Sequence, residues 1–343
     1  MRDRLRVSRV FECRATGLRD ADLGALLVRS PARRGSGIDR DGVAEAWGER
    51  VGDGDRTWLR GVKYASASAS ASASASASAS ASALGALVST AALRALSASA
   101  NPVVALSGGL DAPLAVLAAR RAGLRIDHAL TLAIPGTSYD ESAAARAMAA
   151  ALDLDLEILP IDVPLLADLL RDSVAATGCA FYNLHPVARL VLGRAARARG
   201  FDALLTGDGA DQAARGAIGP ADYVPLVAAL TRASGLQWAA PFVQDDVVEH
   251  LVTRATGADH ERDDPKASLR ALAVAWGLPE ALAFAPKRAT YAPPLPSRAF
   301  PAPARVDRLA RALGRDLAWS SDDRTNVGIA SLSALVDAFG AEV

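Results

Sequence analysis

Residues 103–120 read VVALSGGLDAPLAVLAAR and place an apolar run, a glycine pair and an apolar helical pattern in direct succession. The run at 103–106 is short and begins with two β-branched valines, which favours a β-strand. Helical periodicity follows over residues 113–121. A strand that passes through glycines into a helix is typical of sheets whose parallel strands are connected by helices.

The same alternation continues along the chain. Further strands are predicted at 127–134, 156–161 and 201–206, and further helices at 142–152, 164–170 and 186–199. Repeated strand–helix units predict an α/β fold, a mostly parallel sheet with helices on both faces. From about residue 220 onward the pattern is mainly helical with proline-rich breaks, which predicts a helical C-terminal part that covers one end of the sheet.

The composition changes sharply before this region. Residues 65–83 alternate alanine and serine. Period two is formally a strand pattern, but neither residue supplies a bulky face to bury, so we interpret the tract as a low-complexity linker. A silk-like strand is the alternative. The predicted domains are therefore 1–64, a short separate module; 65–100, linker and connecting helix; 101–305, the α/β domain; and 306–343, C-terminal helices.

Charge and cysteine usage exclude several function classes. Lys and Arg total 38, as do Asp and Glu, so no net field attracts nucleic acid or an anionic membrane. The alanine–serine tract is too polar to span a membrane. Two cysteines provide neither a disulfide framework nor a cysteine-based zinc site, which predicts a reducing, cytoplasmic location. The four histidines lie far apart without a metal-binding spacing.

The glycine pair after the first strand suits an anion. In an open parallel sheet, ligands bind beyond the carboxyl ends of the strands. Ser107, Gly108 and Gly109 lie there, and glycines allow a phosphate to approach the backbone amides at a helix start. The acid that follows, Asp111, suits a Mg²⁺ ion held against those phosphates. The alternative is an ordinary turn with an acid in the first helical turn.

A second loop strengthens this interpretation. Residues 204–212, LLTGDGADQ, also end a strand and also carry glycines and acids, including Asp211. Two acidic loops at one edge of a sheet can hold one Mg²⁺ from two sides. The alternative is a surface turn, since Gly and Asp favour turns.

Five segments carry a family resemblance. They are SGGLDA (107–112), YDESAAARAMAAAL (139–152), TGDGADQAARG (206–216), APFVQDDVVEHLV (240–252) and the run from Pro265 to Pro294. The first resembles the pyrophosphate (PP) loop of the ATP-pyrophosphatase superfamily. Together they resemble the C-terminal synthetase domain of asparagine and β-lactam synthetases. The resemblance implies a Rossmann-like fold, adenine nucleotide α-hydrolase-like, with ATP and Mg²⁺ as cofactors.

The resemblance also implies a reaction. A substrate carboxylate is adenylated by ATP with release of pyrophosphate, and an amine or ammonia then displaces AMP. The implied site residues are Ser107, Gly108 and Gly109 for pyrophosphate; Asp111 and Asp211 for Mg²⁺; Leu106, Ile134, Thr206 and Gly207 at the adenosine; and Lys287 as the catalytic lysine. The alternative for Lys287 is a surface lysine. Lys266 and Arg270 lie four apart on one helical face, and we interpret them as structural or phosphate-steering residues.

Departures from the family qualify the function. Ala112 stands where the family has serine, Gln212 where it has glutamate, and the late Arg–Lys pairing is shifted to Lys287-Arg288. Residues 1–64 resemble only a remnant of the family's glutaminase domain, with Arg2 at the place of its nucleophilic cysteine. The amine is then ammonia, a second substrate, a partner protein's product or a group on the substrate itself.

These features favour a carbon–nitrogen ligase, an amide or lactam synthetase of specialised biosynthesis that acts on a small-molecule or peptide carboxylate. The alternative is a catalytically impaired ATP-binding or scaffold subunit, which Ala112 and Gln212 favour. Nucleobase or tRNA modification is disfavoured by the balanced charge and the lack of a basic stripe. A partner that supplies the missing N-terminal domain, and a homo-oligomer, are both compatible with the sequence.

Overall fold

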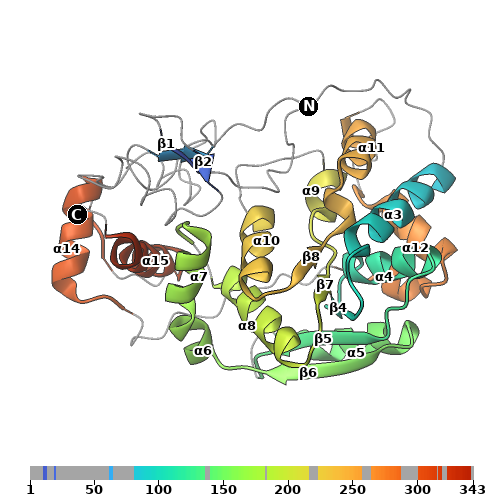
Figure 1. The fold of residues 1–343 in the computed structure, drawn as a ribbon, viewed down its shortest axis with the longest axis horizontal. Helices are drawn as coiled ribbons and strands as arrows, with labels where there is room; N and C mark the ends of the chain where they lie inside the picture. Colours follow the sequence, from blue (N-terminus) through green and yellow to red (C-terminus); the bar gives the residue numbers. More distant parts are fainter. Residues whose placement is uncertain are drawn as a thin grey trace.

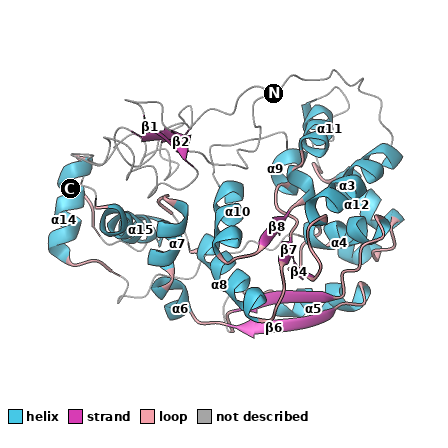
Figure 2. Ribbon diagram, in the orientation of Figure 1, coloured by secondary structure: helices cyan, strands magenta, loops and turns pink. Residues whose placement is uncertain are grey.

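A five-stranded parallel sheet is the larger of the two described sheets (Figures 1 and 2). The computed structural model describes residues 11–13, 19–20, 62–64, 81–135, 140–181, 184–215, 223–256, 264–286, 300–314, 316–318 and 323–340. The strands of the main sheet are β4 (Pro102–Ala105), β5 (His128–Ala133), β6 (Asp155–Pro160), β7 (Ala203–Leu205) and β8 (Gln237–Ala239). Their order is β6-β5-β4-β7-β8, and every pair is parallel. The predicted α/β fold with a parallel sheet is confirmed.

Helices follow most of the strands. They are α3 (Ala81–Leu96), α4 (Asp111–Arg121), α5 (Ser142–Ala151), α6 (Val163–Asp168), α7 (Leu170–Thr177), α8 (His185–Ala198), α9 (Ala210–Ala214), α10 (Tyr223–Ala233), α11 (Asp245–Thr256), α12 (Ala267–Ala275), α13 (Glu280–Ala283), α14 (Pro303–Leu313), α15 (Asp323–Phe339) and the 3-10 turn η2 (Pro241–Val243). A separate small antiparallel sheet is formed by β1 (Phe11–Cys13), β2 (Arg19–Asp20) and β3 (Val62–Tyr64), in the order β2-β1-β3.

Apolar side chains alternate between the two faces of the main sheet. Val103 of β4 packs in a cluster with Leu192 and Ala196 of α8. Its neighbour Val104 belongs to the cluster on the other face, with residues of α3, α4, α5 and α12 such as Leu114. Successive side chains of a strand point to opposite faces, so a central strand that is apolar at both positions requires cover on both sides. Helices on both faces are therefore confirmed.

The C-terminal helices pack at one end of this arrangement. Val306, Leu309 and Leu313 of α14 lie in one cluster with residues of α7, α8 and α15. That cluster also holds Ile134 and Ile161, which directly follow β5 and β6. In Figure 1, α14 and α15 lie at the end opposite α3 and α12. The predicted helical C-terminal part is therefore present and meets the sheet at the ends of two strands.

The structure corrects two predicted elements. Residues 237–239 form the strand β8 within a region predicted to be helical. β8 is a short edge strand whose first two residues, Gln237 and Trp238, are only half-buried, so it has no apolar run to reveal it. The helix predicted at 164–170 is two helices, α6 and α7, and continues to Thr177.

The predicted domain boundaries stay predictions. Residues 65–80 of the alanine–serine tract lie outside the described residues, and 81–83 form the first turn of α3. Of residues 1–64, the structure describes only the backbone of β1, β2 and β3. In the part of the chain that is described, no helix combines the length and apolar character needed to cross a membrane.

Candidate functional site

The two predicted loops lie next to each other because their strands are neighbours. β4 pairs with β7 in parallel, with Val103 opposite Leu204. Each strand runs through a glycine loop into a helix, α4 after β4 and α9 after β7. Asp111 lies in the first turn of α4, and Asp211 in the first turn of α9. The parallel pairing therefore brings both acids to the same edge of the sheet, as the sequence predicts.

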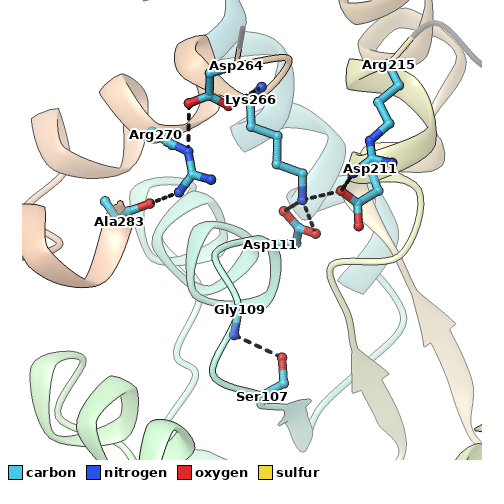
Figure 3. A network of polar contacts seen from close by, with 9 residues as sticks. All are labelled: Ser107, Gly109, Asp111, Asp211, Arg215, Asp264, Lys266, Arg270 and Ala283. Atoms are coloured by element: carbon cyan, nitrogen blue, oxygen red, sulfur yellow. Dashed lines mark hydrogen bonds and ion pairs between the residues drawn. The ribbon is translucent and has the colours of Figure 1, made fainter. Parts of the chain in front are cut away.

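Lys266 joins the two acids. Its Nζ lies 2.7 Å from both carboxylate oxygens of Asp111 and 2.8 Å from Oδ1 of Asp211 (Figure 3). The three side chains are 13%, 23% and 24% exposed, respectively. Solvent screens such an interaction less than it screens one at the open surface. One cationic atom is thus held between carboxylates from two loops.

Gly207 allows the loops to touch. A Cβ atom at this position would lie 2.4 Å from Cβ of Asp111 and 2.6 Å from the backbone nitrogen of Ala112. Gly108 is equally confined, since a Cβ there would lie 2.3 Å from Cβ of Ala144 in α5. Two glycines therefore set how closely the first loop packs against the second loop and against α5.

The first loop is shaped by local contacts. The backbone N–H of Gly109 donates a hydrogen bond to Oγ of Ser107 at 3.2 Å (Figure 3). Gly109 is exposed, and Ser107 and Gly108 are half-buried. Leu110, which precedes α4, makes no side-chain capping bond. A helix that begins directly after a glycine loop is the arrangement that binds phosphates in other proteins.

Three residues predicted at the adenosine have buried side chains. Leu106, Ile134 and Thr206 are 2%, 4% and 2% exposed. Leu106 and Ile134 belong to apolar core clusters, and the hydroxyl of Thr206 donates to Asp208 at 2.8 Å. The role of these residues at a nucleotide therefore stays a prediction. Lys287 and its neighbour Arg288 lie outside the described residues.

Asp208 has a structural role that the sequence analysis missed. Its side chain is 8% exposed and accepts hydrogen bonds from Arg189 Nη2 at 2.9 Å, Thr206 Oγ1 at 2.8 Å and Trp238 Nε1 at 3.0 Å. Arg189 lies in α8 and Trp238 in β8. The buried carboxylate of Asp208 therefore stabilises the second loop through contacts with α8, β8 and the loop itself. The only signal of this role in the sequence is an acid with a glycine on each side.

The backbone of Lys266 is also fixed. Asp264 accepts from the backbone N–H of Lys266 at 3.0 Å and from Nε of Arg270 at 2.9 Å. Arg270 further donates to the carbonyl of Ala283. Arg270 thus makes contacts that support the fold, one of the two roles considered from the sequence, whereas Lys266 reaches the two predicted metal ligands. No sequence pattern predicts the contact of Lys266 with these acids.

The acids fit a magnesium ion. Mg²⁺ is commonly bound by one or two carboxylates, with water and substrate phosphates as the remaining ligands. Asp111 and Asp211 provide two carboxylates that already converge on one cationic atom. Among the described residues, no group of three or more His, Cys, Asp or Glu side chains could hold a metal. Remaining ligands would therefore come from outside that group, which suits an ion that binds with a nucleotide.

Comparisons with known proteins bear on this site. No curated protein matches the chain. One similar solved structure is NMN synthetase from Francisella tularensis, with 13% identity and a TM-score of 0.38; the match covers 74% of this chain and 94% of that chain. Another is the predicted subunit of tRNA methyltransferase from Methanocaldococcus jannaschii DSM, with 16% identity and a TM-score of 0.30; the match covers 55% of this chain and 93% of that chain. The asparagine synthase family model matches residues 83–224, which include both acidic loops. Residues 83–224 are therefore similar to the asparagine synthase family.

Proposed function

We propose that this protein is an ATP-dependent, AMP-forming synthetase that makes an amide or lactam bond. The observation that carries the proposal is the meeting of Asp111 and Asp211 beside the Ser107–Gly109 loop. This site lies at the carboxyl edge of a parallel sheet, where α/β folds bind their ligands. The asparagine synthase match supports the coarser part of the proposal, an ATP-using synthetase.

The proposed chemistry has two steps. A carboxylate oxygen attacks the α-phosphorus of ATP, the bond to the bridging oxygen breaks, and pyrophosphate leaves. An amine then attacks the acyl carbon of the adenylate, AMP leaves, and the new amide nitrogen loses a proton. Negative charge therefore develops first on the pyrophosphate, and a site at the start of α4 can stabilise it with oriented amides.

Each residue has a proposed task in this scheme. The main chain of Ser107, Gly108 and Gly109 binds pyrophosphate, and Asp111 and Asp211 hold Mg²⁺, which supplies positive charge against the leaving group when bound. Leu106, Ile134, Thr206 and Gly207 border the adenosine, as their positions in the family imply. Lys287 neutralises charge at the α-phosphate or on the tetrahedral intermediate.

The amine source distinguishes this proposal from asparagine synthesis. We propose that the amine is ammonia, a second substrate, a partner's product or an amine of the substrate itself, rather than ammonia released from glutamine by this chain. An internal amine would give a lactam. Each of these suits specialised biosynthesis.

ATP–pyrophosphate exchange tests the proposal directly. The full chain is assayed with Mg²⁺ across a panel of amino acids and other carboxylic acids, beside Asp111→Asn and Lys287→Ala. Asp246→Asn is the matched control, because Asp246 pairs with Arg94 on the surface of α11. We expect one acid to stimulate exchange in the wild type and in the control but not in Asp111→Asn.

Two other outcomes would count against the proposal. ATP binding without exchange for any acid would favour the alternative, an ATP-binding or scaffold subunit. Absence of ATP binding would remove the two-loop nucleotide site altogether.

A further inference from the structure

We propose that Lys266 is an internal counter-ion that occupies the metal position until Mg²⁺ and nucleotide arrive together, so that metal binding depends on nucleotide. The part of this inference that concerns nucleotide rests on the proposed function. The part that concerns occupancy of the position by Lys266 rests on geometry alone.

The geometry makes the ammonium and a metal ion alternatives. Nζ of Lys266 contacts both oxygens of Asp111 at 2.7 Å and Oδ1 of Asp211 at 2.8 Å. These are charge-assisted hydrogen bonds of ordinary length. A metal ion held by both acids would compete for the oxygens of Asp111 and would lie close to the ammonium, and two cations at that distance would repel each other. Binding of the metal therefore requires Lys266 to leave.

The backbone of Lys266 is held independently of its ammonium. Its backbone is anchored through Asp264, and Arg270 ties Asp264 to the carbonyl of Ala283. Its ammonium lies at the end of a flexible four-carbon stem. Rotation of the side chain can therefore vacate the position while α12 stays in place.

Nucleotide dependence follows from the number of ligands. Among the described residues, the site offers the metal no third acidic or histidine ligand. A bare ion would thus gain two carboxylates but would also have to displace an ammonium from them. Nucleotide phosphates would supply oxygen ligands for the metal and a new partner for the displaced ammonium. Metal and nucleotide together therefore replace every contact that Lys266 gives up.

Binding of Mn²⁺ to the full chain, without nucleotide, tests the occupancy. The paramagnetic resonance signal of unbound Mn²⁺ reports its dissociation constant for the wild type and for Lys266→Met. We expect Lys266→Met to bind Mn²⁺ at least about tenfold more tightly, because the two carboxylates lose their internal cation. Addition of α,β-methylene-ATP should tighten Mn²⁺ binding in the wild type by a larger factor than in Lys266→Met.

Arg215→Met is the matched control. Arg215 lies 4.0 Å from the same Oδ1 of Asp211, but its side chain is 60% exposed. Its removal deletes one positive charge near the site without emptying the position between the acids. We expect a change in Mn²⁺ affinity of less than about twofold. An equal gain of Mn²⁺ affinity in Lys266→Met and Arg215→Met would show that only the net charge near the site matters, and it would overturn the inference.

A second measurement does not depend on the folding of a variant. In the unaltered protein, acetylation of lysines by acetic anhydride is followed by mass spectrometry with and without saturating Mn²⁺. We expect Lys266 to become more reactive with Mn²⁺, because the displaced amine is no longer held by carboxylates. Unchanged reactivity, or a tightening in Lys266→Met that survives Asp111→Asn in the same chain, would overturn the inference. Intact exchange activity alongside such a result would leave the proposed function standing.

Discussion

Acidic side chains connect the segments around the paired strands β4 and β7 at both ends, but the groups that these acids contact differ between the two ends. At the amino end, Asp202 accepts hydrogen bonds from the backbone N–H groups of Ala100 at 2.7 Å and Asn101 at 3.1 Å, and from the hydroxyl of Ser99. At the carboxyl end, Asp111 and Asp211 contact the ammonium of Lys266. Neutral donors fixed in the chain satisfy the first acid, whereas a cation on a flexible stem contacts the other two.

This difference separates a structural joint from a binding site. Burial alone raises the pKa of Asp202, but hydrogen bonds from Ser99, Ala100 and Asn101 outweigh it and hold the pKa below its usual value. Those donors are part of the fold and cannot be exchanged. At the carboxyl end one cation can replace another, because carboxylates bind an ammonium and a metal ion through the same oxygens. Ligand chemistry is therefore expected only at that end.

The largest expected effect compares the two ends by activity. We expect Asp111→Asn to lower the rate of ATP–pyrophosphate exchange by about a thousandfold, because charge on the leaving group loses its metal. Asp202→Asn should change it by less than about twofold, measured at a temperature at which both variants are folded. A comparable loss in the two variants would mean that the carboxyl end has no special role.

The second prediction concerns stability within the carboxyl end. Asp208→Asn should lower the free energy of unfolding by about 3 kcal/mol, because it removes the charge that pairs with the buried Arg189. Asp111→Asn should change it by less than about 1 kcal/mol, because Lys266 keeps Asp211 as its partner and the repulsion between the two carboxylates is removed. Urea denaturation of both variants measures the difference. Equal losses of unfolding free energy in the two variants would contradict the assignment of Asp208 to stability and of Asp111 to ligand binding.

Close packing of the first loop gives a smaller effect. Gly108→Ala should cost about 2 kcal/mol in unfolding free energy, because the new methyl group would overlap Cβ of Ala144. Gly109→Ala is the matched control, since its nearest neighbour would be Oγ of Ser107 at 3.4 Å. The double variant with Ala144→Gly should recover the loss beyond the cost of the helical glycine itself. Failure of this rescue, by thermal denaturation, would contradict the predicted overlap.

The smallest prediction concerns pH and the amino end. At neutral pH, Asp202→Asn should lower the free energy of unfolding by about 1 kcal/mol. Because the folded pKa of Asp202 is lowered, its contribution is complete above the unfolded pKa of roughly 3.9 and is lost as pH falls through the folded value. The gap between wild type and variant should thus be constant from about pH 7 to 5 and shrink below about pH 4. A gap that widens on acidification would refute this sign.

Local sequence patterns predicted four of the five strands of the main sheet, and β8 was missed because it lacks such a pattern. β4 was expected at 103–106 and is found at Pro102–Ala105, because two valines that serve two buried faces leave a strong local pattern. β8 has no such pattern: Gln237 and Trp238 are half-buried, and the strand is defined by its pairing with β7. An edge strand that depends on a partner elsewhere in the chain cannot be recognised from its own residues.

The same distinction between local patterns and distant contacts applies to the site, of which one part was predictable and another was not. Asp111 and Asp211 follow strands that sequence patterns reveal, so parallel pairing was enough to bring them together. Lys266 contacts Asp111 across 155 residues, and no local pattern encodes that contact. The loop at 206–211 likewise does not say which of its two acids turns inward, because Arg189 and Trp238 decide this from other elements.

The strand order also has a consequence for biosynthesis of the chain. β4, the central strand, pairs with β5 soon after both are translated, but its other partner, β7, is about 100 residues away, since Val103 pairs with Leu204. At ribosomal rates this delay amounts to roughly 5 to 20 seconds. During that interval the side of β4 that later pairs with β7 is an unpaired strand edge, and such an edge can pair with another nascent chain. We therefore expect the yield of folded protein to depend on how fast the ribosome translates the residues between β4 and β7.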